Sequence, residues 1–257
     1  MRIPLPHAGA AGRAPSAPWR RFFPSFLSGW ELGEHVTVLG PTGSGKTTLL
    51  VELAEAAPVC VFLASKRRDR LFTELVRRRG WKLVHSAREL RELPHVEDRA
   101  GREVLLKQWR HVVFWPRSGA SIRATRTGMG SEMRRAFDWA YARGGLALAA
   151  DETLYLSKEL RLSPELETLW HEGRSSQVSL LAATQRPAWI PRSAYSAATY
   201  LFSFSTNDPA DLKRLADIGG GLEPGRLERE IRLLPRYEFM FAAPRERPPI
   251  LLRSRVE

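Results

Sequence analysis

The sequence predicts an α/β fold in which a mostly parallel central sheet is covered by helices on both faces. Three observations lead to this prediction. Short apolar runs alternate with amphipathic helical segments along the 257 residues, which is the pattern of strand–helix–strand units. A glycine-rich stretch, GPTGSGKTT at 40–48, separates the first apolar run from a helical segment. A later apolar run, LALAA at 146–150, ends directly in two acidic residues.

Each element follows from hydrophobic periodicity and from the residues that begin and end helices. Ser131 and Ser163 are expected N-caps, with Pro164 at a first helical position. Gly80 and Gly144 are expected to end helices. These patterns predict strands at 35–40, 59–64, 81–85, 111–115, 146–152, 178–185, 200–205, 237–243 and 249–253, and helices at 46–57, 68–80, about 87–108, 132–143, 163–173, 208–216 and 224–234.

The first 29 residues contain no acid and are rich in Pro, Ala, Ser and Arg. Such a segment cannot bury a core, so we expect 1–29 to be a flexible basic N-terminal arm and 30–257 to form one domain. No apolar stretch approaches the roughly 20 residues that span a bilayer, which predicts no transmembrane segment. The single cysteine, Cys60, excludes an intramolecular disulfide framework and favours a reducing, intracellular setting.

The chain is strongly basic, with a formal net charge of +12. Such a charge attracts polyanions before any specific contact forms, and nucleic acid is the obvious candidate. The alternative is that a GC-rich genome favoured Arg and the charge only keeps the surface soluble. The basic residues gather at 65–70, 77–79 and 117–126.

The stretch 40–48 contains the complete pattern G-x-x-x-x-G-K-T, between an expected strand and an expected helix. Its backbone N–H groups can surround phosphates at a helix N-terminus. We expect Lys46 to reach the β- and γ-phosphates, Thr47 to bind Mg²⁺, and Thr48 to lie near the α-phosphate. The predicted ligands are ATP and Mg²⁺, and the predicted binding residues are Gly40, Pro41, Thr42, Gly43, Ser44, Gly45, Lys46, Thr47 and Thr48.

Two further strand ends carry candidate catalytic side chains. Asp151 is suited to hold Mg²⁺ through its water shell, and Glu152 to orient and deprotonate an attacking water. Gln185, at the end of 178–185, could sense the γ-phosphate or hold that water. The alternative interpretations are that the two acids only cap the following turn and that Gln185 is only solvated. An acid beside Asp151 favours nucleotide hydrolysis over phosphate transfer by a kinase.

With these motifs in place, the chain resembles the FtsK/HerA superfamily of ring-forming DNA-pumping ATPases. Within that superfamily it is most similar to the compact genome-packaging ATPases of membrane-containing and related viruses. The resemblance covers most of residues 30–245 and is strongest at 172–191. The motifs that carry it are GPTGSGKT, ASKRRD, LALAADE, EGRSSQVSLLAATQRPAWIP and FSTNDPADLKRLADIGG.

The resemblance implies a RecA-like P-loop NTPase fold of the ASCE type with an added central strand, in a single ATPase domain at 30–257. It also implies a homo-oligomeric ring, hexameric or pentameric, with ATP sites at subunit interfaces. Arg174 matches the arginine that one subunit donates to its neighbour's site; the alternative is a helix C-terminal charge or a surface salt bridge. A capsid or portal vertex is an implied partner, and the implied location is the host cytoplasm or the virion.

A ring motor grips double-stranded DNA through phosphates so that any sequence can pass. The segment RSGASIRATRTGMG is the candidate pore loop, with Arg117, Arg123 and Arg126 among small residues. The second candidate is SKRRDR, with Arg67 and Arg68, although its Lys66 could instead lie near the nucleotide.

The expected function is an ATP-driven double-stranded DNA translocase, in the first place a viral genome-packaging motor subunit. The sequence shows no recognisable winged-helix module, membrane spans or β-barrel domain, which disfavours chromosome pumping at a septum. Two alternatives stay open: a HerA/VirD4-like cellular or conjugative DNA-pumping ATPase, and a non-translocating ATP-regulated scaffold.

Overall fold

The computed structural model describes residues 13–97, 103–216, 223, 225–246 and 249–256. A nine-stranded sheet forms its centre, in the order β11-β10-β9-β1-β8-β7-β2-β6-β3. The pairings are parallel except those of β10, which runs antiparallel to β9 and β11. The strands are β1 (His35–Leu39), β2 (Cys60–Leu63), β3 (Lys82–Val84), β6 (His111–Phe114), β7 (Leu146–Ala150), β8 (Val178–Thr184), β9 (Ala198–Phe204), β10 (Glu238–Ala243) and β11 (Ile250–Arg255). Strands β4 (His95–Glu97) and β5 (Glu103–Leu105) form a separate antiparallel pair.

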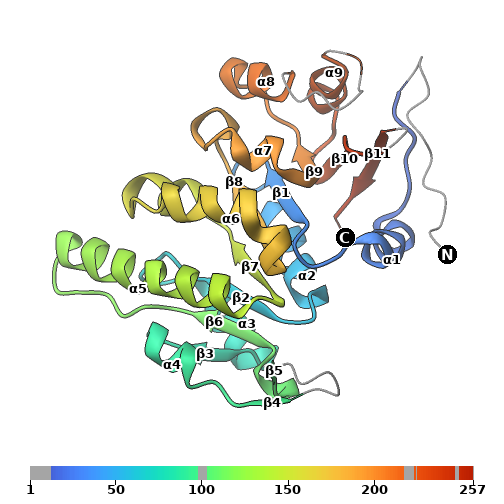
Figure 1. Ribbon diagram of the computed structural model, residues 1–257. Coiled ribbons are helices and arrows are strands. Elements are labelled where there is room, and N and C mark those ends of the chain that lie inside the picture. Colours follow the sequence, from blue (N-terminus) through green and yellow to red (C-terminus); the bar gives the residue numbers. More distant parts are fainter. Residues whose placement is uncertain (1–12, 98–102, 217–222, 224, 247–248, 257) are drawn as a thin grey trace.

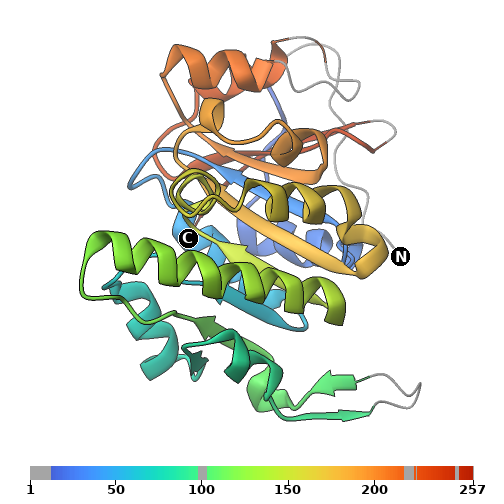
Figure 2. The same cartoon turned by 60° about the vertical axis from the view of Figure 1, so that its left-hand side comes forward.

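Helices cover both faces of the sheet, as Figures 1 and 2 show. One face packs against α1 (Trp19–Gly29), α2 (Lys46–Ala56) and α3 (Arg70–Arg78). The other packs against α4 (Ala87–Arg91), α5 (Ile122–Arg143), α6 (Ser163–Ser176), α7 (Ser193–Ser196), α8 (Pro209–Ala216) and α9 (Arg226–Arg232). Short 3₁₀ turns occur at Lys107–Trp109 and Pro187–Trp189, and a π-helical turn at Tyr155–Glu159.

The central strands β1, β7 and β8 are buried along their whole length. Near-continuous apolar runs are typical of parallel strands that are covered on both faces, and this is why these runs could be recognised. The predicted α/β fold is therefore confirmed. In the part of the chain that the structure describes, no helix is both long and apolar enough to cross a membrane.

The prediction of a flexible arm over 1–29 is wrong for its second half. Residues 19–29 form α1, and Trp19, Phe22 and Phe26 are buried. They pack with the ring edges of Phe202, Phe239 and Phe241 from the sheet. Apolar side chains three and four positions apart form one helical face, and this face outweighs the basic composition. Residues 1–12 lie outside the described part.

Two predicted segments differ from the structure. The helix expected at about 87–108 stops at Arg91, and the hairpin β4–β5 follows Pro94, which cannot continue a helix. Residues 98–102 lie outside the described part.

The basic segment after β6 is not a loop beyond Ser121. The Ser121 side chain accepts a hydrogen bond from the Ala124 N–H, and α5 begins there. Gly130 lies inside α5, where a Cβ would stand 3.3 Å from the Leu160 carbonyl oxygen. Here glycine provides close packing rather than a turn.

Candidate nucleotide-binding site

The site lies where the parallel strands end at their carboxyl edge. Strand β8 is hydrogen-bonded between β1 and β7, so that Leu39 is level with Thr184 and Ala150 with Ala182. The glycine-rich loop follows β1, the two acids follow β7, and Gln185 follows β8 between them. The crevice beyond the carboxyl ends of such strands is the usual ligand position in α/β folds.

The glycine-rich loop has the backbone that a phosphate cradle requires. Gly43 and Gly45 have φ of 75° and 102°, in the left-handed region that side chains disfavour. A Cβ at Gly40 would stand 2.7 Å from the Phe204 Cβ, so the loop lies directly on β9. Ser44 Oγ is buried and has no hydrogen-bond partner among the described residues. The loop therefore presents an unsatisfied hydroxyl at the start of α2, where an anion site is expected.

Lys46, Thr47 and Asp151 meet at the mouth of the cradle. Thr47 Oγ1 lies 2.9 and 3.0 Å from the two Asp151 carboxylate oxygens, and Lys46 Nζ lies 3.5 Å from the nearer one. Lys46 and Asp151 are buried. A hydroxyl and a carboxylate side by side are hard oxygen donors, and Mg²⁺ commonly takes one or two such protein ligands together with phosphate oxygens and water. These residues fit a Mg²⁺–nucleotide complex.

A chain of hydrogen bonds connects the cradle to the second acid. Thr42 Oγ1 donates to Gln185 Oε1 over 2.7 Å, and Gln185 Nε2 donates to Glu152 Oε1 over 3.1 Å. The amide of Gln185 is thereby oriented by its two partners. The structure thus joins Glu152 and Gln185, the two side chains that the sequence assigned to the attacking water, to Thr42 of the glycine-rich loop.

Lys66 is the site residue for which the sequence left two roles open. Its Nζ lies 3.2 Å from Glu152 Oε1 and 3.7 Å from Asp69 Oδ2. Burial acts to lower the pKa of Lys66, but the charges of Glu152, Asp151 and Asp69 outweigh burial and raise that pKa above its usual value. Lys66 is therefore an ammonium ion held against Glu152. Its position directly after β2 was the signal for this role.

A pocket of about 380 Å³ opens beside the loop, between residues 41–44 and the segment that begins β10. The Tyr237 ring lies on this side, since a Cβ at Gly45 would be 3.6 Å from Tyr237 Cδ1. Tyr237 has φ of 68°, which is rare for a non-glycine residue, and the Arg236 guanidinium lies 4.7 Å from its ring centroid. Neither residue belongs to a sequence motif of the site, because only the antiparallel return of β10 brings them to the loop.

Arg174 lies at the other edge of the sheet. It is exposed near the end of α6, and the seven residues of β8 separate that edge from Gln185. At about 3.3 Å per residue, the strand alone spans roughly 20 Å. The side chain therefore does not reach the glycine-rich loop of its own subunit.

The predicted DNA-contact residues fall into two groups. Arg67 and Arg68 are exposed after β2, and Arg117 is exposed after the neighbouring strand β6. The two loops are joined by a 2.7 Å hydrogen bond from Trp115 Nε1 to the Lys66 carbonyl oxygen. The remaining two residues belong to α5 rather than to a pore loop, which corrects that part of the prediction: Arg123 is exposed, and Arg126 pairs with Glu159 at 2.8 Å.

No protein-family model matches the sequence, and a comparison with curated proteins gives no match. Solved structures do match. The genome packaging NTPase B204 from Sulfolobus turreted icosahedral virus 2, in complex with AMPPCP, superposes with a TM-score of 0.62 at 15% identity over 87% of this chain and 98% of that chain.

B204 from Sulfolobus Turreted Icosahedral Virus, a DNA-packaging ATPase, gives a TM-score of 0.58 at 17% identity over 87% and 98% of the two chains. VirB4 of Thermoanaerobacter pseudethanolicus gives 0.58 at 13% identity over 87% and 89%. At these identities the likeness concerns the fold. The chain has the RecA-like P-loop fold that the FtsK/HerA resemblance implied.

Proposed function

We propose that this protein is an ATPase that hydrolyses ATP between the subunits of a ring and moves double-stranded DNA, as a viral genome-packaging motor in the host cytoplasm. The observation that supports ATP hydrolysis is the pair of hydrogen bonds that runs from Thr42 through Gln185 to Glu152. These bonds lie next to the contact between Thr47 and Asp151. This pair of hydrogen bonds supports Glu152 as the carboxylate base and Gln185 as the orienting amide beside the γ-phosphate.

Each residue of the site has its own role in the proposed hydrolysis of ATP. Backbone N–H groups of 42–48 and the Lys46 ammonium bind the phosphates and orient the γ-phosphate. Thr47 and Asp151 would hold Mg²⁺, which supplies charge neutralisation at the phosphates. Gln185 orients the attacking water, and Glu152 accepts its proton. The base of the nucleotide fits the pocket of about 380 Å³ beside Tyr237.

Arg174 supports assembly into a ring. Because it lies at the edge of the sheet opposite its own phosphate cradle, it can act on a nucleotide only if that edge faces another subunit. Heterologous, head-to-tail contacts of this kind close into rings. A planar guanidinium delivered in this way stabilises the charge of the transferring phosphate and makes each site incomplete in a lone subunit.

The DNA part of the proposal rests on the charge of +12 and on the exposed arginines Arg67, Arg68 and Arg117 at the nucleotide edge. Lys66 connects these loops to Glu152, so DNA contact and hydrolysis share one segment of the chain. The fold similarity to the packaging NTPase B204 supports packaging, with a capsid or portal vertex as the partner. The similarity to VirB4 is nearly equal, so the fold does not select packaging, and the second candidate is a HerA/VirD4-like cellular or conjugative DNA-pumping ATPase with the same chemistry.

The test is an ATPase assay with and without double-stranded DNA on the wild type and on Glu152→Gln. Loss of a general base lowers turnover by about 10²- to 10⁴-fold. We expect DNA to stimulate the wild type, and the variant to bind ATP normally but to turn over at background. Binding without DNA-stimulated hydrolysis would instead support the ATP-regulated scaffold. Translocation is measured by displacement of a triplex-forming strand from duplex DNA.

A further inference from the structure

The chain leaves the sheet directly at Gln185. Strand β8 pairs with β7 up to Ala182 and with β1 up to Thr184, so Gln185 lies beyond both ladders. The sheet therefore fixes this residue only from the side of the strand that ends before it. The orientation of its amide also depends on what holds the segment that follows, residues 186–189.

Arg186, the next residue, lies between two carboxylates of one helix. Its Nη2 is 2.9 Å from Asp208 Oδ2, and its Nε is 3.4 Å from Asp211 Oδ2. The second contact is an ion pair without a hydrogen bond, since Nε has no hydrogen-bond partner among the described residues. Asp208 directly precedes α8, and Asp211 belongs to its first turn. The guanidinium is thus tied to the start of α8.

Each of the two carboxylates is itself fixed through its other oxygen. Asp208 Oδ1 accepts hydrogen bonds from the N–H groups of Ala210 and Asp211 over 3.0 and 3.2 Å, as the cap of a helix does. Asp211 is buried, and its Oδ1 accepts the Ala188 N–H over 2.9 Å. All four carboxylate oxygens therefore have a partner, and a fully connected polar network of this kind is rigid.

The main chain of residues 186–189 is held by further contacts. The Tyr195 hydroxyl donates a hydrogen bond to the Pro187 carbonyl oxygen. The Arg214 guanidinium donates to the Ala188 carbonyl oxygen over 3.5 Å. The segment after Gln185 is therefore fixed by the elements around it, although it belongs to no strand.

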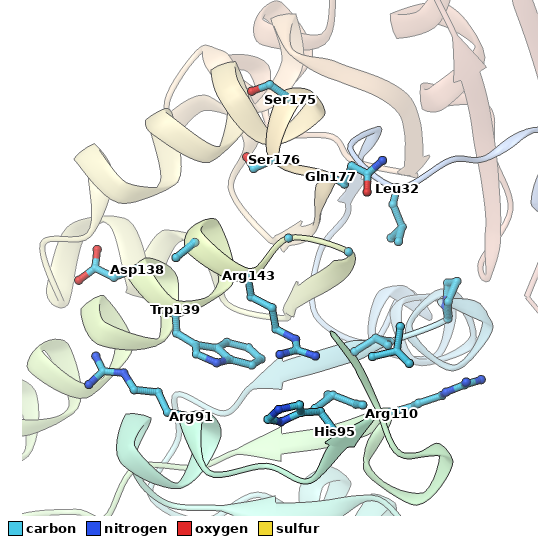
Figure 3. A pocket seen from close by; sticks show the side chains of 17 residues that line it. Leu32, Arg91, His95, Arg110, Asp138, Trp139, Arg143, Ser175, Ser176 and Gln177 are labelled. Carbon is cyan, nitrogen blue, oxygen red and sulfur yellow. The ribbon is translucent and has the colours of Figure 1, made fainter. Parts of the chain in front are cut away.

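A planar cation suits this position. The Trp189 ring lies over the Arg186 guanidinium, whose carbon is 4.7 Å from the ring centroid. Figure 3 shows a similar pair, Arg143 beside Trp139 at 5.8 Å, in a groove of about 1060 Å³ at the amino ends of β2, β7 and β8. That pair is at the sheet edge opposite Gln185, so a stacked arginine is not in itself a feature of the nucleotide site. At Arg186 the ring and two carboxylates act on one guanidinium, which a flat, forked side chain allows.

Stability alone does not account for this network. Burial raises the pKa of Asp211, although the Ala188 N–H and the charge of Arg186 act in the opposite direction. Apolar side chains of similar volume often replace a buried ion pair without loss of stability. What the ion pairs provide here is a fixed position for the residue that is bonded to Gln185.

We propose that Arg186 is a positioning residue for Gln185. Its ion pairs with α8 fix the main chain from which the Gln185 amide reaches Glu152. This inference rests on the proposed role of Gln185 in hydrolysis and deepens it, because it names the group that holds the amide in place. A misplacement of about 1 Å can cost about 10²-fold in rate, so a looser segment should slow hydrolysis without weakening nucleotide binding.

A double-mutant cycle tests this proposal. Single-turnover hydrolysis, with protein in excess over ATP, is measured for the wild type, Arg186→Met, Gln185→Ala and the double variant, and ATP affinity is measured by competition with a fluorescent analogue. We expect Arg186→Met to lower the rate about 10- to 100-fold and to change ATP affinity by less than about twofold. In the Gln185→Ala background, the same substitution should lower the rate by less than about twofold, since the amide that it positions is gone.

A charge-free variant guards against a loss of folding. Arg186→Met leaves Asp211 buried without its cation, whereas Arg186→Met combined with Asp211→Asn removes both charges and keeps an acceptor for the Ala188 N–H. Circular dichroism and thermal unfolding verify that each variant is folded. We expect the charge-free variant to hydrolyse ATP as slowly as Arg186→Met.

Two single substitutions complete the comparison. Arg186→Lys keeps the charge but not the planar fork, so its rate should lie between those of Arg186→Met and the wild type. Arg192→Met is the matched control: it removes a nearby exposed arginine, and its rate should equal that of the wild type.

The outcomes separate the two proposals. If the wild type does not hydrolyse ATP, or if Glu152→Gln hydrolyses it equally fast, the proposed function fails and the positioning role fails with it. If hydrolysis is established but Arg186→Met lowers the rate by the same factor in both backgrounds, Arg186 serves only the fold, and this inference alone is overturned. It is also overturned if weaker ATP binding explains the whole loss, or if Arg186→Met hydrolyses ATP like Arg192→Met.

Discussion

Lys66 Nζ lies 3.2 Å from Glu152 Oε1, the oxygen that also accepts the Gln185 amide. The carboxylate that we propose as the general base is therefore held by two donors, one from the strand end of β2 and one from the strand end of β8. The same Lys66 belongs to an exposed basic loop. This arrangement gives a physical link between an exposed basic loop and the proposed general base.

Removal of Lys66 tests whether this contact positions Glu152. With one donor left, the carboxylate samples more orientations, and we expect Lys66→Met to lower DNA-free turnover about tenfold, a fraction of what complete loss of a general base costs. ATP affinity should change by less than about twofold, because the phosphate cradle is intact. The matched control is Arg67→Met, which removes one neighbouring exposed cation. Equal turnover in the two variants would refute a positioning role.

Arg174 and Glu152 should complement each other across subunits. Arg174→Ala and Glu152→Gln are each expected to be nearly inactive, since loss of such an arginine lowers turnover by about 10³- to 10⁵-fold. In an equimolar mixture, an intact base faces an intact arginine at about a quarter of the interfaces of a randomly assembled ring. We therefore expect about a quarter of wild-type turnover, for sites that act independently.

The control for this mixture is Lys46→Ala combined with Glu152→Gln. Both of these changes damage the same site, so no interface in that mixture is complete. Recovery only in the mixture that contains Arg174→Ala supports action in trans. Recovery in neither mixture counts against it.

Tyr237 is expected to contribute to binding of the nucleotide base. Stacking of a base on an aromatic ring is worth about 1–3 kcal/mol, so Tyr237→Ala should weaken ATP binding about tenfold, while Tyr237→Phe should retain affinity. Inorganic tripolyphosphate has no base. Its inhibition constant, obtained by competition with a fluorescent ATP analogue and corrected for the affinity of that analogue, should be the same for all three proteins. An equal loss for tripolyphosphate would show that the substitution disturbs the loop instead.

His35 should make the fold sensitive to mild acid. Burial and the charge of Arg245 lower the pKa of His35 to about 4, and its Nδ1 accepts the Leu180 N–H. His35 binds a proton near pH 6.5 in the unfolded chain, but only near pH 4 in the folded chain. The contribution of His35 to the free energy of unfolding is therefore complete above pH 6.5 and falls as the pH is lowered from 6.5 to 4. At pH 5 the loss is about 2 kcal/mol.

Denaturant unfolding at pH 7 and pH 5 measures this loss. The control is His35→Asn, which keeps an acceptor at the same position but does not titrate. The difference between the two pH values should shrink by the contribution of His35. An unchanged difference would assign the acid sensitivity to other groups.

Local sequence was sufficient to predict those features that depend on a few neighbouring residues. The cradle at 40–48 and the buried strands β1, β7 and β8 could be predicted because glycine spacing and apolar runs act locally. The placement of Asp151, Glu152 and Gln185 followed from parallel strands that end at one edge. The α1 helix is also encoded locally, in the spacing of Trp19, Phe22 and Phe26, although the basic composition of 1–29 predicts a flexible arm.

Other features depend on contacts between distant segments. The close approach of Gly130 in α5 to Leu160 joins two segments that are separate in sequence. The approach of Tyr237 to the cradle needed the antiparallel return of β10. Sequence by itself determined the nucleotide chemistry, because that chemistry is carried by short motifs. Only the tertiary structure decided which cations are paired with acids, because pairing depends on side chains far apart in the chain.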